Sequence, residues 1–176
     1  MQPMLLRDYF GQSCQGWYAS PKVDGHRLLW TGDEYVLRGG GVLDVPAEWK
    51  VGMPNHPLDG ELDPGIGNFN RIQGMIRDGF AGLTFAVFDI PAPGPFSRRL
   101  KALSRLSLPD HCYLVHHWRI DGPQAVWEEA NRICDAGGEG LVIRNPRGLY
   151  RSGERSDDVL RMVPADPAVN RRRAAA

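Results

Sequence analysis

Glycine and proline interrupt this chain at short intervals and so limit the length of any helix or strand. The 176 residues include 21 glycines and 14 prolines, which are dispersed and do not gather into a linker. Both residues tend to end or kink regular elements. The sequence therefore predicts many short elements packed in one domain of ordinary size, without an internal repeat.

Hydrophobic patterning assigns these short elements to strands and helices. The clearest strand is the apolar run 83–90, which stops at Pro91. The other predicted strands are 17–19, 27–30, 35–38, 57–62, 112–118, 140–144 and 159–163. Helices are predicted at 69–77, around an apolar face of Phe96, Leu100, Leu103 and Leu106, and from Gly122 to Gly137. Many strands with three short helices predict a mixed α+β domain.

Composition excludes several protein classes. No apolar run approaches the roughly 20 residues that span a bilayer, and the N-terminus lacks the pattern of a secretory signal. Cys14, Cys112 and Cys134 are an odd and scattered set, which argues against a disulfide framework or a zinc site. We therefore expect a cytoplasmic monomer with no membrane partner. We expect the domain to occupy residues 1–166, with a disordered basic and alanine-rich tail at 167–176.

The segment from Pro21 to Arg27 carries the most chemical information. Lys22 follows a predicted strand and precedes an Asp24-Gly25 turn, with a carboxylate and a cation close by in sequence. A lysine amine is a nucleophile only when neutral, and its ordinary pKa is about 10.4. Burial and neighbouring cations favour the neutral form. The motif alone is weak, since a surface lysine before a turn is the more common explanation of it.

Further charged residues fall at the ends of predicted strands. Asp59 and Glu61 lie two apart in one strand and should face the same side of it. Glu139 stands between glycines before a buried strand, and such carboxylates can hold a divalent cation bound to phosphates. Arg38 precedes three glycines, where the backbone permits close approach of a ligand. Phe88 could offer a ring face to a base, although each of these residues alone has an ordinary structural explanation.

Taken in order, these segments resemble the nucleotidyltransferase (adenylation) domain of ATP-dependent DNA ligases. This domain belongs to the lysine nucleotidyltransferase superfamily, which also holds RNA ligases and mRNA capping enzymes. The resemblance covers roughly residues 17–164 and is strongest to small phage, viral and bacterial ligases. The matching segments are KVDGHR at 22–27, LRGGG at 37–41, LDGEL at 58–62, LTFAVFDIP at 83–91, GGEGLVIRNP at 137–146 and SDDVLRMVP at 156–164.

The resemblance implies a fold and an activity. The fold would be an ATP-grasp-like domain of antiparallel sheets flanked by short helices. Lys22 would attack the α-phosphorus of ATP, release pyrophosphate and carry AMP before nicks in duplex DNA are sealed in replication, repair or recombination. Arg27 would contact the ribose and orient the phosphates, and Arg38 would bind phosphate. Arginines and Mg²⁺ or Mn²⁺ suit this chemistry, which depends on positioning and charge stabilisation.

The resemblance also assigns supporting residues. Glu61 would contact the ribose or a metal, Glu139 would assist metal binding, and Phe88 would stack on adenine. Asp24 and Asp59 would contact these side chains, not the ligand, and hold them in position.

The match departs from the family in two places. The last motif usually presents Lys-x-Lys, and here Arg161 and Val163 occupy those positions. Arg161 keeps a charge that could meet the transition state, whereas Val163 removes a cation. The family normally continues into an OB-fold domain, and the few residues after Val163 are too short for one. Two alternatives follow: another chain supplies a separate OB-fold partner, or the protein is a truncated or minimal form. An RNA ligase, a GTP-dependent capping-type enzyme and a catalytically weak nucleotide- or DNA-binding module remain alternatives.

Overall fold

A computed structural model describes residues 1–164 of the chain. The predicted domain limit at residue 166 and the predicted tail at 167–176 lie outside the described residues. The strands are β1 (Leu5–Asp8), β2 (Trp17–Pro21), β3 (His26–Trp30), β4 (Tyr35–Leu37), β5 (Leu58–Asp63), β6 (Thr84–Asp89), β7 (Cys112–Leu114), β8 (Trp118–Ile120), β9 (Leu141–Arg144) and β10 (Arg155–Met162). The α-helices are α1 (Ile72–Arg77), α2 (Phe96–Leu103) and α3 (Gly122–Asp135), and short 3₁₀ helices lie at Ala47–Trp49 and Phe69–Arg71.

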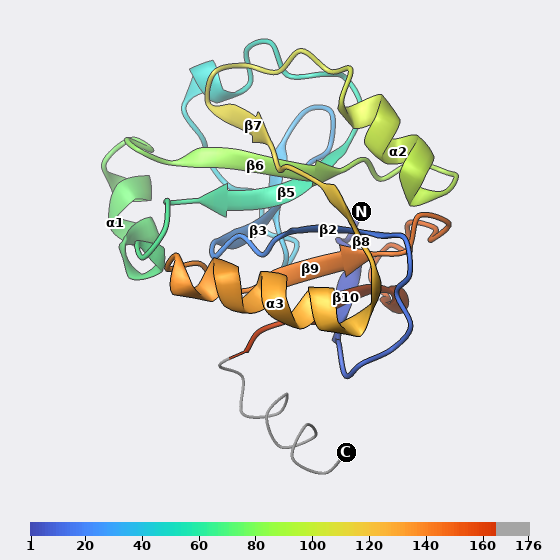
Figure 1. Ribbon diagram of the computed structural model, residues 1–176. Coiled ribbons are helices and arrows are strands. Elements are labelled where there is room, and N and C mark those ends of the chain that lie inside the picture. Colours follow the sequence, from blue (N-terminus) through green and yellow to red (C-terminus); the bar gives the residue numbers. More distant parts are fainter. Residues whose placement is uncertain (165–176) are drawn as a thin grey trace.

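The strands form two five-stranded sheets that lie one above the other (Figure 1). One has the order β1-β10-β9-β2-β8 and the other the order β4-β3-β5-β6-β7. The α+β class predicted from the sequence is confirmed. The sheets are mixed, however, because β1 pairs with β10 and β6 pairs with β7 in parallel. The second parallel pair follows from α2, which carries the chain across between β6 and β7.

Each sheet buries its own apolar cluster. In the β4-β3-β5-β6-β7 sheet, Trp30, Tyr35 and Phe85 pack with Trp49 and Phe80. The Tyr35 ring makes close edge contacts with both Trp49 and Phe85.

Helix α3 covers the outer face of the other sheet (Figure 1). Its apolar stripe of Val126, Ala130 and Ile133 packs in one cluster with Leu141 of β9 and Leu160 of β10. The spacing predicted from the sequence is therefore the spacing that the fold uses. The two clusters stabilise the two sheets. The candidate site lies where the chain passes from one sheet to the other.

The structure differs from the sequence predictions at several elements. Residues 112–118 form two strands, β7 and β8, which belong to different sheets, because the chain crosses between the sheets at 115–117. The first helix is α-helical only from Ile72, and its first turn is a 3₁₀ helix. β1 was not predicted, since its four residues are mostly half-buried and show no alternation that marks a strand.

Neither a membrane-spanning helix nor a disulfide is found in the part of the chain that the structure describes. Among residues 1–164, no helix is both long and apolar enough to cross a membrane. Cys14, Cys112 and Cys134 are free thiols.

Candidate nucleotide-binding site

Lys22 lies on the segment that passes from one sheet to the other. β2 ends at Pro21 in the first sheet and β3 begins at His26 in the second, so Lys22 sits between the sheets. Its backbone N–H donates to the Gly140 carbonyl at 2.8 Å, which ties it to the start of β9. Gly25 makes the crossing tight, because a Cβ there would lie 2.1 Å from the Leu62 carbonyl oxygen.

The Lys22 amine donates a hydrogen bond to Glu139 in a close ion pair. The side chains are 19% and 28% exposed, so both are mostly buried yet reachable from solvent. Gly140 fixes the approach of Glu139: its φ is +152°, and a Cβ there would lie 2.2 Å from the Met162 carbonyl oxygen. The segments KVDGHR and GGEGLVIRNP, which are far apart in the sequence, are therefore in contact through Lys22 and Glu139.

Arg27 is held by a buried network below Lys22. Its Nε and Nη2 donate to the two carboxylate oxygens of Asp59, each at 2.7 Å, and Nη2 also donates to the Met4 carbonyl at 3.1 Å. Tyr150 donates its hydroxyl to the same carboxylate at 2.8 Å. Such a two-pronged pair orients the guanidinium plane. The pKa of Arg27 is raised because the charge and hydrogen bonds of Asp59 outweigh burial.

Glu61 lies opposite Arg27 in the register of β3 and β5. Burial raises the pKa of Glu61 to about 7, and the nearby charges of Arg27 and Lys22 oppose that rise only in part. Asp59 and Glu61 both act on Arg27, which agrees with the prediction that they face one side of β5. Glu61 is thus a carboxyl group whose charge depends on pH near neutrality.

Phe88 is 7% exposed and packs with two guanidinium groups. The Arg27 and Arg144 carbons lie 4.6 and 5.0 Å from the centroid of its ring. These contacts are cation–π interactions. A flat base that stacks on Phe88, as the resemblance implies, would have to displace one of the two arginines from the ring.

Arg144 and Tyr150 are site residues that the sequence reasoning missed. Arg144 is 4% exposed, donates to the Ser20 hydroxyl at 2.9 Å, and has a pKa lowered by burial to about 10. The available signal was a cation at the end of the buried run Leu141–Arg144, which is uncommon unless the cation has a partner or a role. Tyr150 carried no signal, because its hydrogen-bond partners at the site, Asp59 and the Met4 backbone N–H, lie 91 and 146 positions away.

A cavity of about 190 Å³ brings most of the predicted residues together. Its lining includes Met4, Leu5, Leu6, Lys22, Arg27, Arg38, Glu61, Arg155 and Arg161. A narrow extension of about 30 Å³ reaches Phe88, Val142 and Arg144. Arg38, which follows β4, and Arg161, on β10, therefore reach the same space from different sheets.

Two predicted residues lie on the other side of Lys22. Asp24 and Glu139 line a second cavity of about 440 Å³, together with Lys22. Val163 follows β10 and is not among the lining residues of either space. Valine has no charge, so position 163 supplies no cation to either cavity.

The carboxylates of Glu61 and Glu139 could hold a metal ion only if a bound ligand supplied further oxygen atoms. Among residues 1–164, no group of three or more His, Cys, Asp or Glu side chains could hold a metal ion by itself. The charge of Glu139 is one of the causes that raise the pKa of Glu61, and the two carboxylates lie on either side of Lys22. A magnesium ion often uses one or two carboxylates plus substrate phosphates. The residues present fit a cation that arrives bound to a nucleotide.

Comparison with known proteins adds independent information. No protein-family model matches the chain. A DNA ligase of Haemophilus influenzae is 30% identical over 171 residues, which cover 92% of this chain and 63% of that ligase. The chain thus spans less than two thirds of the relative's length.

Solved structures agree with this sequence match. A Lig E DNA ligase superimposes with a TM-score of 0.82 at 26% identity, over 93% of this chain and 68% of that one. The chain has the fold of a DNA ligase nucleotidyltransferase domain. The ligase domain of LigD from M. tuberculosis (TM-score 0.72, 23% identity, 93% of this chain and 59% of that one) shares the fold. So does the Chlorella virus DNA ligase-adenylate (TM-score 0.69, 16% identity, 93% and 67%).

The sequence resemblance to ATP-dependent DNA ligases is therefore confirmed at the level of sequence and fold. The roles of individual residues in this chain stay predictions.

Proposed function

We propose that this nucleotidyltransferase domain is the adenylating part of an ATP-dependent DNA ligase. Lys22 attacks the α-phosphorus of ATP: a P–N bond forms, the P–O bond to pyrophosphate breaks, and the amine loses a proton. The AMP is then transferred to the 5′-phosphate of a nick, and the 3′-hydroxyl displaces it. The observation that carries the proposal is the convergence of Lys22, Arg27, Arg38 and Glu61 on one cavity.

The neighbours of Lys22 have distinct roles in this scheme. Glu139 accepts the hydrogen bond of the Lys22 amine and so fixes its position before ATP arrives. Arg27, held flat by Asp59, directs its guanidinium to the ribose and α-phosphate. Arg38 and Arg161 supply cations where negative charge increases in the transition state. Phe88 would stack on the adenine after one of the two arginines leaves its ring.

A divalent cation, Mg²⁺ or Mn²⁺, is the proposed cofactor alongside ATP. When bound, it would offset charge on the phosphates. Glu61 and Glu139 are the carboxylates placed to meet it, on the two sides of Lys22. Nicked duplex DNA is the proposed substrate, a cytoplasmic monomer the proposed form, and a separate OB-fold domain a proposed partner for the sealing steps.

The decisive experiment uses the small number of lysines. The sequence has three, Lys22, Lys50 and Lys101. Purified chain is incubated with Mg²⁺ and α-labelled ATP or GTP, and label that survives denaturation is measured. We expect label from ATP that is lost in Lys22→Ala and kept in Lys50→Ala and Lys101→Ala. No label from either nucleotide would refute the enzymatic proposal, and label from GTP alone would favour a capping-type enzyme.

One observation favours a second candidate, a nucleotide-binding module of low activity. Val163 stands where the resemblance calls for a cation, and its side chain does not line the cavity. Equilibrium binding of ATP together with a label yield far below one per chain would support that candidate. Nicked DNA and a nicked RNA strand, offered to the labelled chain, then separate DNA ligation from RNA ligation.

A further inference from the structure

A groove of about 470 Å³ lies between helix α2 and residues 114–117, where the chain crosses from β7 to β8. Leu103 and Val115 are buried and line it together with the half-buried Leu100 and Leu114, so one side of this α2 groove is apolar. Within the described residues, the α2 groove shares no lining residue with the nucleotide cavity or with its narrow extension. It is therefore a separate space.

Helix α2 lines the groove with hydrogen-bond donors and a cation. Ser97, Leu100, Lys101 and Ser104 lie at positions i, i+3, i+4 and i+7, which form one face of the helix and of the residue that follows it. Among residues 1–164, no acidic side chain lines the groove. An anionic group there would meet the Lys101 amine and two hydroxyl groups, without a like charge beside it.

The wall opposite α2 brings a second cation. The guanidinium carbon of Arg119 lies 3.9 Å from the centroid of the Tyr18 ring, and Tyr18 lines the groove. His117 adds no charge at neutral pH, because burial and the charge of Arg144 lower its pKa to about 3. The positive charges around the apolar side therefore come from two elements, α2 and β8.

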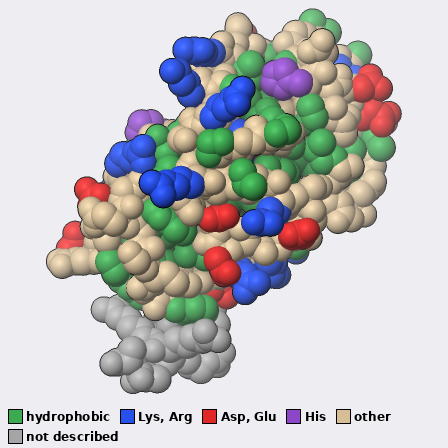
Figure 2. All heavy atoms as spheres, turned by 90° about the vertical axis from the view of Figure 1, so that its right-hand side faces the viewer, with side chains coloured by type: hydrophobic (Ala, Val, Ile, Leu, Met, Phe, Trp, Pro, Cys, Tyr) green, Lys and Arg blue, Asp and Glu red, His purple; other side chains and the backbone are tan. Residues whose placement is uncertain are grey.

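Positive charge is concentrated around this groove in a chain whose formal net charge is zero. Residues 96–109 include four basic residues and no acidic one. Arg99 is buried in an ion pair, whereas Arg98, Lys101 and Arg105 are exposed and take part in none of the ion pairs within residues 1–164. Figure 2 views the side of the molecule on which α2 lies in Figure 1, and basic side chains gather in its upper left part with hydrophobic ones beside them.

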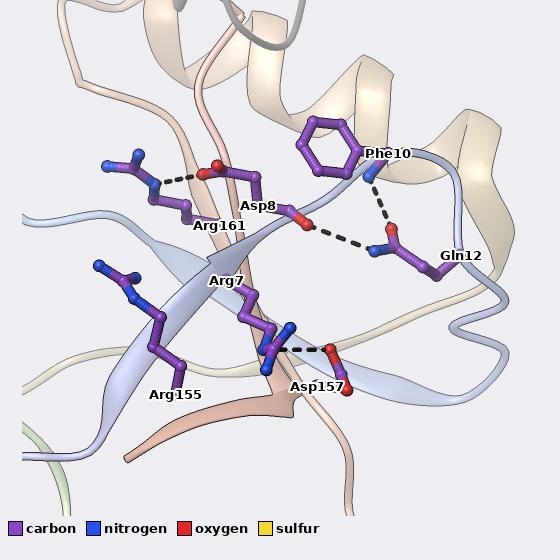
Figure 3. A pocket seen from close by; sticks show the side chains of 7 residues that line it. All are labelled: Arg7, Asp8, Phe10, Gln12, Arg155, Asp157 and Arg161. Carbon is purple, nitrogen blue, oxygen red and sulfur yellow. Dashed lines mark hydrogen bonds and ion pairs between the residues drawn. The ribbon is translucent and has the colours of Figure 1, made fainter. Parts of the chain in front are cut away.

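The arginines of the β1–β10 edge differ from those of α2, because they belong to the nucleotide cavity. Arg155 and Arg161 line that cavity, and Figure 3 shows their guanidinium groups extending to the same side. None of Arg98, Lys101 and Arg105 lines it. The exposed cations of α2 thus have no part in the proposed adenylation.

The combination of an apolar side and flanking cations favours a peptide over a nucleic acid. A phosphate backbone would satisfy the cations, but it presents no aliphatic side chain to the apolar side. An extended acidic peptide offers carboxylates and aliphatic side chains at alternating positions. Burial of the aliphatic side chain supplies affinity, and the complementary charges supply orientation and selectivity.

We propose that the α2 groove binds an acidic segment of a partner protein. An aliphatic side chain of that segment packs against Leu103 and Val115, and its carboxylates lie beside Lys101 and Arg119. The site goes beyond the proposed function, since it needs neither ATP nor a nick. Binding there tethers this domain to the partner and leaves the nucleotide cavity open.

Peptide binding tests the proposal. A short fluorescent peptide of alternating glutamate and leucine is titrated with the chain, and its anisotropy is measured at about 0.1 M salt. One control peptide carries lysine in place of glutamate, and another carries serine in place of leucine. We expect each control peptide to bind wild type at least about tenfold more weakly than the glutamate–leucine peptide does.

Matched charge reversals locate the site on the chain. Lys101→Glu should weaken binding of the glutamate–leucine peptide about fivefold to tenfold and strengthen binding of the lysine–leucine peptide. Lys50→Glu makes the same change in net charge at an exposed lysine outside the groove, and it should bind both peptides as wild type does. Equal binding by wild type and Lys101→Glu, or no binding at about 1 mM peptide, overturns the site.

Two further measurements separate the groove from nucleic-acid binding and from the proposed function. If Lys101→Glu weakens binding of a nicked duplex as much as it weakens binding of the peptide, the groove is a nucleic-acid site and the peptide proposal is overturned. Labelling of Lys22 by ATP should be equal in Lys101→Glu and wild type. Peptide binding without labelling supports the groove and refutes the proposed function, whereas labelling without peptide binding overturns the groove alone.

Discussion

Glu61 gives a pH dependence of stability whose sign follows from its surroundings. Burial raises its pKa from 4.5 to about 7 in the folded chain. Between these values the folded state binds the proton more tightly than the unfolded state does, so the free energy of unfolding decreases as pH rises through this window. The full loss, reached above about pH 7, is roughly 3 kcal/mol, from about 1.4 kcal/mol for each pH unit.

The variant Glu61→Gln removes this titration and keeps the shape of the side chain. We expect it to match wild type near pH 4.5 and to exceed it by up to about 3 kcal/mol at pH 8.5. Urea unfolding at both pH values, with a chelator and without nucleotide, measures the difference. Glu154→Gln, at an exposed glutamate, is the control and should show no such change with pH. A difference between Glu61→Gln and wild type that is constant with pH would refute the reasoning.

Three further changes test packing and alignment. Arg99→Met should lower the free energy of unfolding, measured with urea, by about 3–5 kcal/mol. The reason is that Arg99 and Asp89 are each 2% exposed, so the change leaves a buried carboxylate without its cation. Adding Asp89→Asn to Arg99→Met should recover part of that loss. Gly60→Ala should destabilise by about 1–3 kcal/mol, since its Cβ would lie 2.4 Å from a carbonyl oxygen of β6, and equal stability would contradict the β5–β6 packing. Val163→Lys should increase the yield of labelled Lys22 if residue 163 aligns with the second lysine of the family motif, and an unchanged yield would count against that alignment.

Local sequence patterns determined most of the secondary structure. Strand β6 and helix α3 match their predicted positions because each is one uninterrupted apolar pattern that ends at a proline or a glycine. The same patterns failed where an element depends on a distant partner. β1 is a strand because β10 lies beside it, and 112–118 divides because the chain changes sheets there.

The motifs likewise supplied the residue types of the candidate site but not their pairing. Lys22, Glu61 and Glu139 were singled out from the order of short motifs. Lys22 and Glu139 are 117 positions apart, and only the crossing between the sheets brings them into an ion pair. The pairing of Arg27 with Asp59 and the raised pKa of Glu61 depend in the same way on tertiary contacts.

The sequence by itself determined which residues could do nucleotide chemistry and which segments would be strands or helices. The tertiary structure decided which charges face each other, which are buried, and that Arg38, Arg155 and Arg161 reach the cavity beside Lys22 from segments far apart in the sequence. The reason is physical. Element type follows from hydrophobic periodicity over a few neighbours, whereas burial and ion pairing depend on residues far apart in the chain that only the packed sheets bring within a few ångströms.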